Sequence, residues 1–187
     1  RASLPELPDA KRARYEQELG LSAYNAGVLT AEVEAARWFE ALLERLGPDQ
    51  AQRASNWVTS ELFGALNRLG RTIADSPVSP AQAAELLALI GDGTLSGTLA
   101  KQVFEIMLET GEGAAAVVEA RGLKQTSDTG AIDAAIADVL DRNADKVAEY
   151  KAGKEALFGF FVGQVMKAMQ GKANPKVVNE LLRKALG

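Results

Sequence analysis

The chain has 187 residues, of which 47% are apolar and 25% charged, and its formal net charge is -4. These values are ordinary for a globular protein, which excludes a disordered chain and a uniformly basic surface. The sequence contains neither Cys nor His, which excludes disulfides, thiolate or imidazole metal ligands, and Ser–His–Asp or Cys–His catalysis within the chain.

The N-terminal residues 1–8 are predicted to form an extended linker. Pro5 and Pro8 bias the residues before them toward extended conformations. The chain shows no signal peptide and no apolar run of the roughly 20 residues that span a bilayer, so we expect a cytoplasmic protein without membrane contact. Because the first residue is not Met, we expect either a piece of a longer protein, with an upstream domain missing, or a processed product.

Helical periodicity dominates the chain after this linker and strand patterns are nearly absent, so we predict an all-α fold. Residues 9–122 are expected to form a bundle of about five to six helices. The five longer ones are expected at about 9–19, 30–46, 49–69, 80–90 and 96–109. Residues 22–29 are expected to form a short turn or helix, and a further short helix ends near residue 122. Thr30 is expected to cap the helix that follows it. Ser79, Pro80 and Gln82 have the spacing of a capping box.

A glycine-rich segment at residues 91–101 precedes one of these helices. It lacks the Gly-Lys-[Ser/Thr] ending of a P-loop, and no strand comes before it. We therefore predict a turn between two helices, capped by Ser96 or Thr94, rather than a nucleotide site.

Residues 123–130 are polar and aperiodic, and they are predicted to be a hinge or linker. Beyond them, residues 131–187 are expected to fold as a smaller tail domain of three to four helices. Phe158, Phe160 and Phe161 cannot all lie on one side of a helix. One of these rings could therefore be exposed and contact a partner, although core packing is the expected role of the cluster.

Positive charge is concentrated toward the C-terminus. Residues 1–122 contain 11 Lys/Arg and 17 Asp/Glu, whereas residues 123–187 contain 10 and 8. From Lys151 to the end, seven basic residues face two acidic ones. Such a stretch on an acidic protein indicates a site for a polyanion, and the alternative is a set of solvated lysines.

The segment around Asn174 is the most informative part of this basic stretch. Asn174 has the chemistry of a helix N-cap and Pro175 that of a first helical residue. Lys172 and Lys176 flank the free N–H groups of that helix start, and together they would form a corner that accepts a phosphate. The alternative is a helix start with solubilising lysines.

Two other charged groups are interpreted more simply. The acidic pairs Asp138/Asp141 and Glu40/Glu44 have the spacing of a solvated helix face and are poor metal or acid–base candidates. The basic run 11–14 is either a solvated face or a contact to RNA or to the missing domain.

An ordered set of motifs along the whole chain resembles the B-subunit family of the tRNA-dependent amidotransferases (GatB). The first motifs are similar to the segment after that family's catalytic domain, and the last are similar to its YqeY-type tail. In chain order they are Leu4–Tyr15, Leu19–Thr30, Ser96–Phe104, Gly122–Gln125, Tyr150–Lys154, Gly163–Ala168, Gly171–Lys176 and Asn179–Leu182.

The resemblance implies part of a glutamine-hydrolysing ligase of protein biosynthesis, which amidates Glu-tRNA(Gln) and often Asp-tRNA(Asn). In that family the upstream domain of B uses ATP and Mg²⁺, the A subunit releases ammonia, and the C subunit helps to hold A and B together. The helical and tail domains contact the tRNA body, with the tail near the elbow. Because the upstream domain is not in this chain, we expect no catalytic residue, metal site or cofactor here.

The residues expected to contact the tRNA backbone belong to the tail. They are Lys154, Lys167, Lys172, Asn174, Lys176, Arg183 and Lys184. Contacts of this kind position an RNA without reading its bases. The alternative function is an all-α protein-interaction module that docks on other subunits or on the rest of B. A stand-alone enzyme would require a cleft with paired carboxylates or a Ser–Lys pair.

Overall fold

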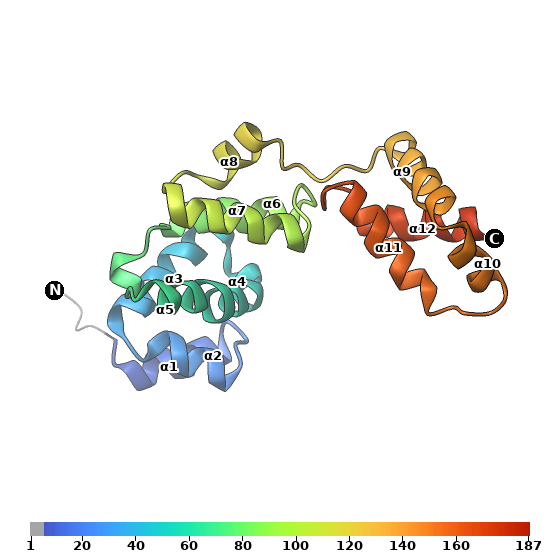
Figure 1. Ribbon diagram of the computed structural model, residues 1–187. Helices are drawn as coiled ribbons and strands as arrows, with labels where there is room; N and C mark the ends of the chain where they lie inside the picture. Colours follow the sequence, from blue (N-terminus) through green and yellow to red (C-terminus); the bar gives the residue numbers. More distant parts are fainter. Residues whose placement is uncertain (1–5) are drawn as a thin grey trace. The chain divides into compact units, whose positions relative to one another are not determined.

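The computed structural model describes residues 6–187, which form two compact units. The first unit runs to Leu89 and also takes in Phe104–Ala116, and the second consists of Ile90–Val103 and Val117–Gly187. Every named element of the described chain is helical (Figure 1), so the predicted all-α fold is confirmed. No helix among these residues is long and apolar enough to cross a membrane.

Short helices joined by tight turns make up both units. They are α1 (Pro8–Gln17), α2 (Ala23–Thr30), α3 (Val33–Leu46), α4 (Ala51–Trp57), α5 (Phe63–Leu69), α6 (Pro80–Gly91), α7 (Gly97–Thr110), α8 (Ala114–Arg121), α9 (Thr129–Arg142), α10 (Ala144–Lys151), α11 (Leu157–Ala168) and α12 (Pro175–Leu186). The 3-10 turns η1 (Pro48–Gln50) and η3 (Ile73–Asp75) and the π turn η2 (Val58–Leu62) lie between them. The helices up to α8 outnumber the five to six expected, partly because η2 divides one predicted helix. The tail has the expected number, α9–α12.

Two predicted boundaries remain predictions. Residues 1–5 of the predicted linker 1–8 lie outside the described residues, and α1 already begins at Pro8. The predicted hinge 123–130 falls within the second unit, and α9 begins inside it at Thr129.

The core of the first unit is built on one face of α3. Phe39 and Leu42 on this face are fully buried, and the Phe39 ring lies 5.6 Å from the ring of Tyr15 on α1. Tyr15 is the one buried residue of α1, and its hydroxyl donates to the Ala36 carbonyl at 3.4 Å. Full burial of one such side chain contributes about 1.5–3 kcal/mol, so Tyr15 is the main apolar attachment of α1.

Thr30 does not cap α3, so this prediction is wrong. Thr30 is the last residue of α2, and its hydroxyl donates to the Ala26 carbonyl at 2.7 Å. Because the hydroxyl is engaged one turn back, α3 starts only after Glu32, whose extended backbone occupies the N-cap position without a side-chain cap bond. The capping box at Ser79 is confirmed. Its Oγ accepts from the Gln82 N–H at 3.2 Å, and the Gln82 side chain accepts from the Ser79 N–H at 2.9 Å.

The predicted helix 49–69 is interrupted by the π turn. Around this turn the hydroxyl of Thr59 donates to the Ser55 carbonyl at 2.9 Å, and that of Ser60 donates to the Asn56 carbonyl at 2.6 Å. The buried Asn25 of α2 donates to Ser55 Oγ at 3.1 Å and to Asn56 Oδ1 at 2.8 Å. A buried amide needs such partners, so this polar cluster fixes α2 against α4.

An ion-pair cluster attaches α1 to α3. Glu40 of α3 accepts from Lys11 and from Arg14, both at 2.7 Å, and Arg14 also donates to Glu6 at 2.8 Å. The Arg14 guanidinium chiefly lowers the pKa of Glu6 to about 2. Partial burial raises the pKa of Glu40, but hydrogen bonds from Lys11 and Arg14 outweigh it and the net shift is downward. The lysine and arginines of the basic run 11–14 are therefore paired within the chain, since its remaining cation contacts Glu16 at 3.2 Å.

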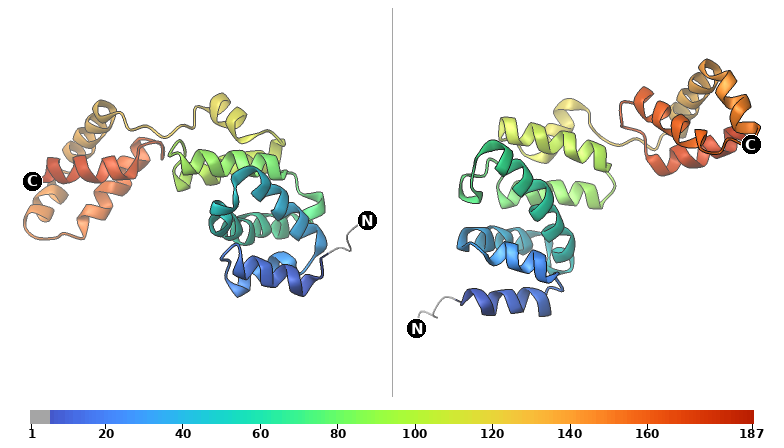
Figure 2. Two further views of the ribbon diagram at one scale, coloured as in Figure 1. Left: turned by 180° about the vertical axis from the view of Figure 1, so that it is seen from behind. Right: turned by 60° about the horizontal axis from the view of Figure 1, so that its bottom comes forward.

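The tail has its own core, formed where α9, α11 and α12 pack side by side (Figures 1 and 2). Its buried residues are Ile132, Ile136, Val139, Phe161, Val165, Ala173, Val178, Leu182 and Leu186. Apart from Ala173, which lies in the turn before α12, they recur within each helix at three- and four-residue spacings, so each helix contributes one apolar stripe and keeps its other side outside the core.

Replacing Glu40 with Gln is expected to destabilise the first unit by about 0.5–1 kcal/mol at neutral pH, as for a partly exposed ion pair. Because the folded-state pKa of Glu40 is lowered, this stabilisation is complete above the ordinary Glu pKa and is lost as the pH falls through the lowered value. The difference from wild type should therefore shrink on acidification. Thermal unfolding followed by tryptophan fluorescence measures it, since Trp38 and Trp57 both lie in the first unit.

Glu44→Gln on the same helix is the control and should change little at any pH. A Glu40→Gln difference that stays constant or grows toward pH 2 would contradict the assigned role of the ion pairs.

Candidate nucleic-acid interface

The start of α12 has the predicted local structure. Asn174 is its N-cap, with Oδ1 accepting from the Lys176 N–H at 3.0 Å, and Pro175 is the first helical residue. The side-chain nitrogen Nδ2 of Asn174 donates to Ser127 Oγ at 3.1 Å. Both ends of one amide group are thus engaged, which fixes the turn before α12 in a single arrangement.

Backbone hydrogen bonds attach part of the predicted hinge to this turn. The Thr126 N–H donates to the Lys172 carbonyl at 2.6 Å, and the Asn174 N–H donates to the Thr126 carbonyl at 2.8 Å. They form an isolated parallel bridge between Thr126 and Ala173, the one extended pairing found among the described residues. The backbone that carries Lys172 is therefore fixed by a segment far away in sequence.

The end of α11 determines where this turn begins. The Gln170 N–H donates to the Lys167 carbonyl at 3.0 Å, and the Gly171 N–H donates to the Met166 carbonyl at 2.8 Å, which is the Schellman pattern. Gln170 has a φ of 55° and Gly171 a φ of 72°. Gln170 is the one non-glycine residue with positive φ in the described chain, a conformation that costs a side chain about 1–2 kcal/mol.

The structure separates the seven predicted contact residues into two groups. The turn group lies between the end of α11 and the start of α12 and consists of Lys167, Lys172, Asn174 and Lys176. The distal group consists of Lys154, Arg183 and Lys184. The Arg183 guanidinium lies over the ring of Phe158 in the first turn of α11, so α12 runs back along α11. A 12-residue helix is about 18 Å long, so the two groups lie at opposite ends.

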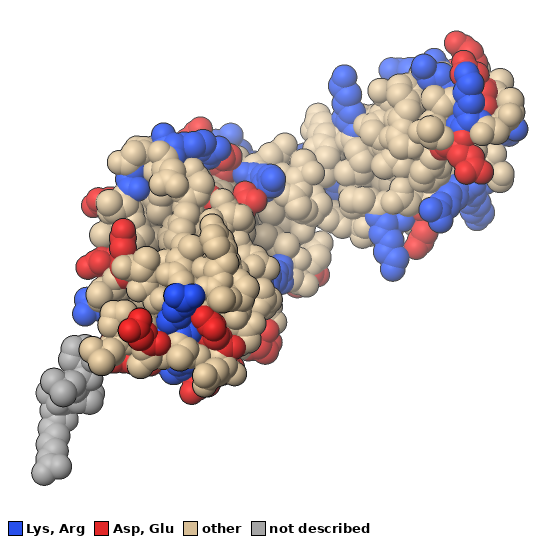
Figure 3. Space-filling model, turned by 90° about the horizontal axis from the view of Figure 1, so that it is seen from below, with Lys and Arg blue, Asp and Glu red and all other residues tan. Residues whose placement is uncertain are grey.

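Among the six cations of the two groups, Lys154 is the one that has a carboxylate partner within the described residues. Lys154 donates to Glu149 at 2.7 Å, and this hydrogen bond is the main reason that the pKa of Glu149 is lowered. Within the described residues no carboxylate pairs with Lys167, Lys172 or Lys176. The stretch from Ala156 to Asn179 contains these lysines and no acidic residue. On the face in Figure 3, the basic side chains of the tail form separate groups rather than one continuous patch.

The outward side of α11 has two glycines beside the turn group. Gly159, Gly163 and Lys167 are exposed and spaced by four residues, so they lie on one face, opposite the buried Phe161 and Val165. A Cβ at either glycine would meet nothing within 4 Å. Because a glycine inside a helix costs about 0.5–1 kcal/mol relative to alanine, packing within the tail does not explain these two residues. They expose backbone that an external surface can approach closely.

We call this surface, formed by Gly159, Gly163 and Lys167, the glycine face. Sequence analysis selected Lys167 but missed the two glycines. Their four-residue spacing within an otherwise apolar helix was the available signal.

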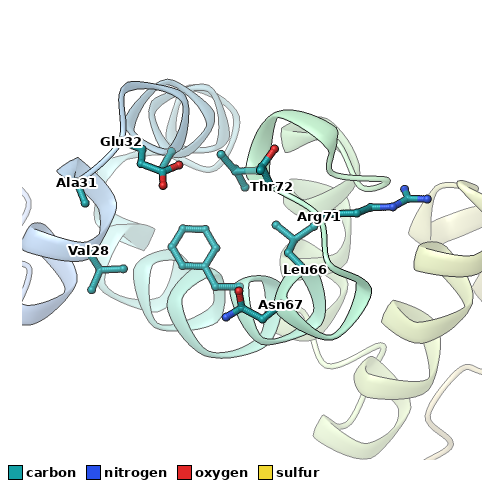
Figure 4. A pocket seen from close by; sticks show the side chains of 10 residues that line it. Val28, Ala31, Glu32, Leu66, Asn67, Arg71 and Thr72 are labelled. Carbon is teal, nitrogen blue, oxygen red and sulfur yellow. The ribbon is translucent and has the colours of Figure 1, made fainter.

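The first unit contains a pocket of about 410 Å³ (Figure 4). Its floor is apolar, with Val28, Phe63 and Leu66 among the lining residues. Glu32 is the one carboxylate among its described lining residues, and Figure 4 shows Arg71 pointing away from the cavity. The described lining of this pocket therefore contains no pair of carboxylates.

Comparison with known proteins agrees with the resemblance found in the sequence. A family model described as the GatB domain matches residues 37–186. The B subunit of aspartyl/glutamyl-tRNA(Asn/Gln) amidotransferase is 74% identical over 190 residues in Rhizorhabdus wittichii and 72% over 194 residues in Novosphingobium aromaticivorans. The Zymomonas mobilis protein of the same description is 64% identical over 189 residues. Each match covers 100% of this chain, which spans only 38–39% of the relatives' length.

Replacing Gln170 with Gly is expected to stabilise the tail by about 1 kcal/mol, because glycine adopts the left-handed conformation without a Cβ penalty. Chemical denaturation followed by far-UV circular dichroism of the tail transition measures the change. Gln164→Gly, inside α11, is the matched control and should destabilise the tail by about 1 kcal/mol. Equal effects of the two substitutions would show that the left-handed Gln170 carries no strain.

Proposed function

The chain belongs to the GatB domain family, and on that premise we propose that it is the tRNA-positioning part of the B subunit of an aspartyl/glutamyl-tRNA amidotransferase. In this role it performs no chemistry of its own. It holds the body of the mischarged tRNA so that the acylated end reaches an active site elsewhere in the longer protein. Relatives described as the B subunit of aspartyl/glutamyl-tRNA(Asn/Gln) amidotransferase, one of them 74% identical, support the proposal.

The glycine face and the adjoining turn group carry the proposal on structural grounds. Lys167, Lys172 and Lys176 have no carboxylate partner among the described residues, so their charges are available to an external anion. Gly159 and Gly163 let that anion approach the helix backbone without meeting side chains. A sugar–phosphate backbone fits this combination, because phosphate contacts depend on charge and shape and do not read bases.

The remaining partners follow from the same premise. We propose that ATP and Mg²⁺ act in the part of the longer protein outside this chain, and that the A and C subunits complete the complex in the cytoplasm. The relatives are themselves described as single subunits of the amidotransferase, which supports a multi-subunit assembly.

Protein docking by the tail has less support. Docking surfaces between proteins have an apolar centre. The large apolar side chains that are most exposed are Leu7, Tyr24, Val33 and Leu69, and all four lie in the first unit. The described surface of the tail instead offers lysines and glycine backbone, which fits a polyanion better than an apolar partner.

A charge-reversal experiment tests the proposed function. The double variant Lys172→Glu/Lys176→Glu should lose most of its affinity for a tRNA(Gln) or tRNA(Asn) transcript in filter binding at low salt, because two phosphate contacts become repulsive. The double variant Arg37→Glu/Arg45→Glu, on exposed positions of α3 in the first unit, makes the same change in net charge and should bind nearly as wild type. Undetectable binding by the wild-type chain, or equal losses in both variants, would overturn the proposal.

Replacing Gly159 and Gly163 is a second test, because the stability of the tail should rise while its affinity for tRNA falls. Gly159→Ala and Gly163→Ala should each stabilise the tail by about 0.5–1 kcal/mol, since the new methyl groups meet no neighbour. The same methyl groups would keep the phosphate backbone away from α11, so the affinity for tRNA should fall several-fold.

Gly64→Ala is the matched control, because Gly64 is also helical, exposed and without neighbours within 4 Å of an added Cβ. It should stabilise the first unit and leave binding unchanged. Alanine variants of α11 that bind as tightly as wild type would show that close approach to this helix is not used.

A further inference from the structure

Two cations of the tail lie over aromatic rings of α11. The Lys146 ammonium, from α10, is 4.9 Å from the centroid of the Phe160 ring, and the Arg183 guanidinium, from α12, is 5.5 Å from that of Phe158. Arg183 was selected from the sequence, but Lys146 was not. The pairing of Lys146 with Phe160 depends on how α10 packs against α11, and no spacing within one helix reveals it.

An aromatic ring holds a cation without neutralising it. The ring carries no net charge, so the attraction to its quadrupole fixes the position of the ammonium and leaves the full positive charge available. A carboxylate partner would cancel that charge. The acidic residues nearest to Lys146 along α10 are Asp145 and Glu149, and Glu149 is bonded to Lys154 at 2.7 Å. Lys146 contributes only a Coulombic lowering of the Glu149 pKa and forms no ion pair among the described residues, so it is held in place and still charged.

The position of Phe160 places this ammonium beside the glycine face. Successive residues of a helix are about 100° apart, so Phe160 lies about 60° around α11 from Gly163, on the edge of that face. Phe160 is half-buried, and its ring contacts Phe161 of the core, with centroids 5.5 Å apart. Phe158 lies about 160° around the helix from Phe160, so Arg183 is on the opposite flank.

We propose that Lys146, fixed over Phe160, is a further phosphate-binding residue of the glycine face and contacts the sugar–phosphate backbone of the RNA that crosses it. This proposal rests on the proposed function and deepens it. The RNA backbone would lie along the bare side of α11, with Lys167 on the face itself and Lys146 along one edge. The RNA contact surface thus includes α10 as well as α11 and the turn before α12.

The test compares two tail cations that contribute equally to net charge but differ in their partners. Lys146→Met and Arg142→Met each remove one positive charge from the tail, and Arg142 is already paired with Asp138 at 3.0 Å. Filter binding of a tRNA transcript is measured for both variants over a series of salt concentrations. Lys146→Met should weaken binding several-fold and reduce the slope of log affinity against log salt by about 0.7–0.9, as expected for one lost phosphate contact. Arg142→Met should change the affinity less than twofold.

The aromatic ring is tested separately. Phe160→Leu keeps Lys146 and its charge but removes the surface that holds it, so the loss of affinity should lie between that of Lys146→Met and wild type, with the salt slope nearly preserved. A far-UV circular dichroism melt of each variant verifies that the tail remains folded.

The outcomes separate this proposal from the proposed function. Equal affinities and salt slopes for Lys146→Met and Arg142→Met, alongside a loss in Lys172→Glu/Lys176→Glu, would overturn the role of Lys146 and leave the proposed function intact. Absence of tRNA binding by the wild-type chain at low salt would overturn both.

Discussion

The tail depends on one constraint, which is that none of its helices is long enough to be stable alone. Isolated helices shorter than about 12–15 residues are marginal in water, and α9–α12 have 8 to 14 residues each. Their stability therefore comes from burying one stripe of each helix around Phe161 and Val165. Because that stripe uses only one side of α11, the opposite side is free to contain glycines, which a helix with less tertiary support would tolerate poorly.

The cations of the first unit and those of the tail differ in their partners, and the net charge of -4 does not reveal this difference. In the first unit Lys11 and Arg14 are bonded to Glu6 and Glu40 and tie α1 to α3, so their charges are used inside the protein. In the tail, Lys167, Lys172 and Lys176 have no such partner among the described residues, and Lys146 lies over a ring. Charge counts along the sequence locate the basic segment, but only the contacts show which cations remain available.

The sequence predicted helix ends correctly where the structure depends on residues within one short segment. The capping box at Ser79 and the N-cap at Asn174 formed as expected, because a cap depends on residues within one turn. Predictions were wrong or incomplete where distant residues decide. Thr30 bonds backward and leaves α3 uncapped, and the helix expected at 49–69 contains a π turn beside the buried Asn25. The seven predicted contact residues fall into two groups, because α12 runs back along α11.

The bridge between Thr126 and Ala173 has a consequence for hydrogen exchange. The Asn174–Ser127 hydrogen bond beside it joins residues 47 positions apart, and α9 and α12, which are separated by a similar length of chain, also pack against each other. The packing of α9 on α12 therefore already brings these two segments together. The bridge itself consists of two backbone hydrogen bonds outside any helix, so we expect it to open in the native state more often than the helices around the tail core. The turn that carries Lys172 would then exchange its amide hydrogens sooner than the helices on either side of it.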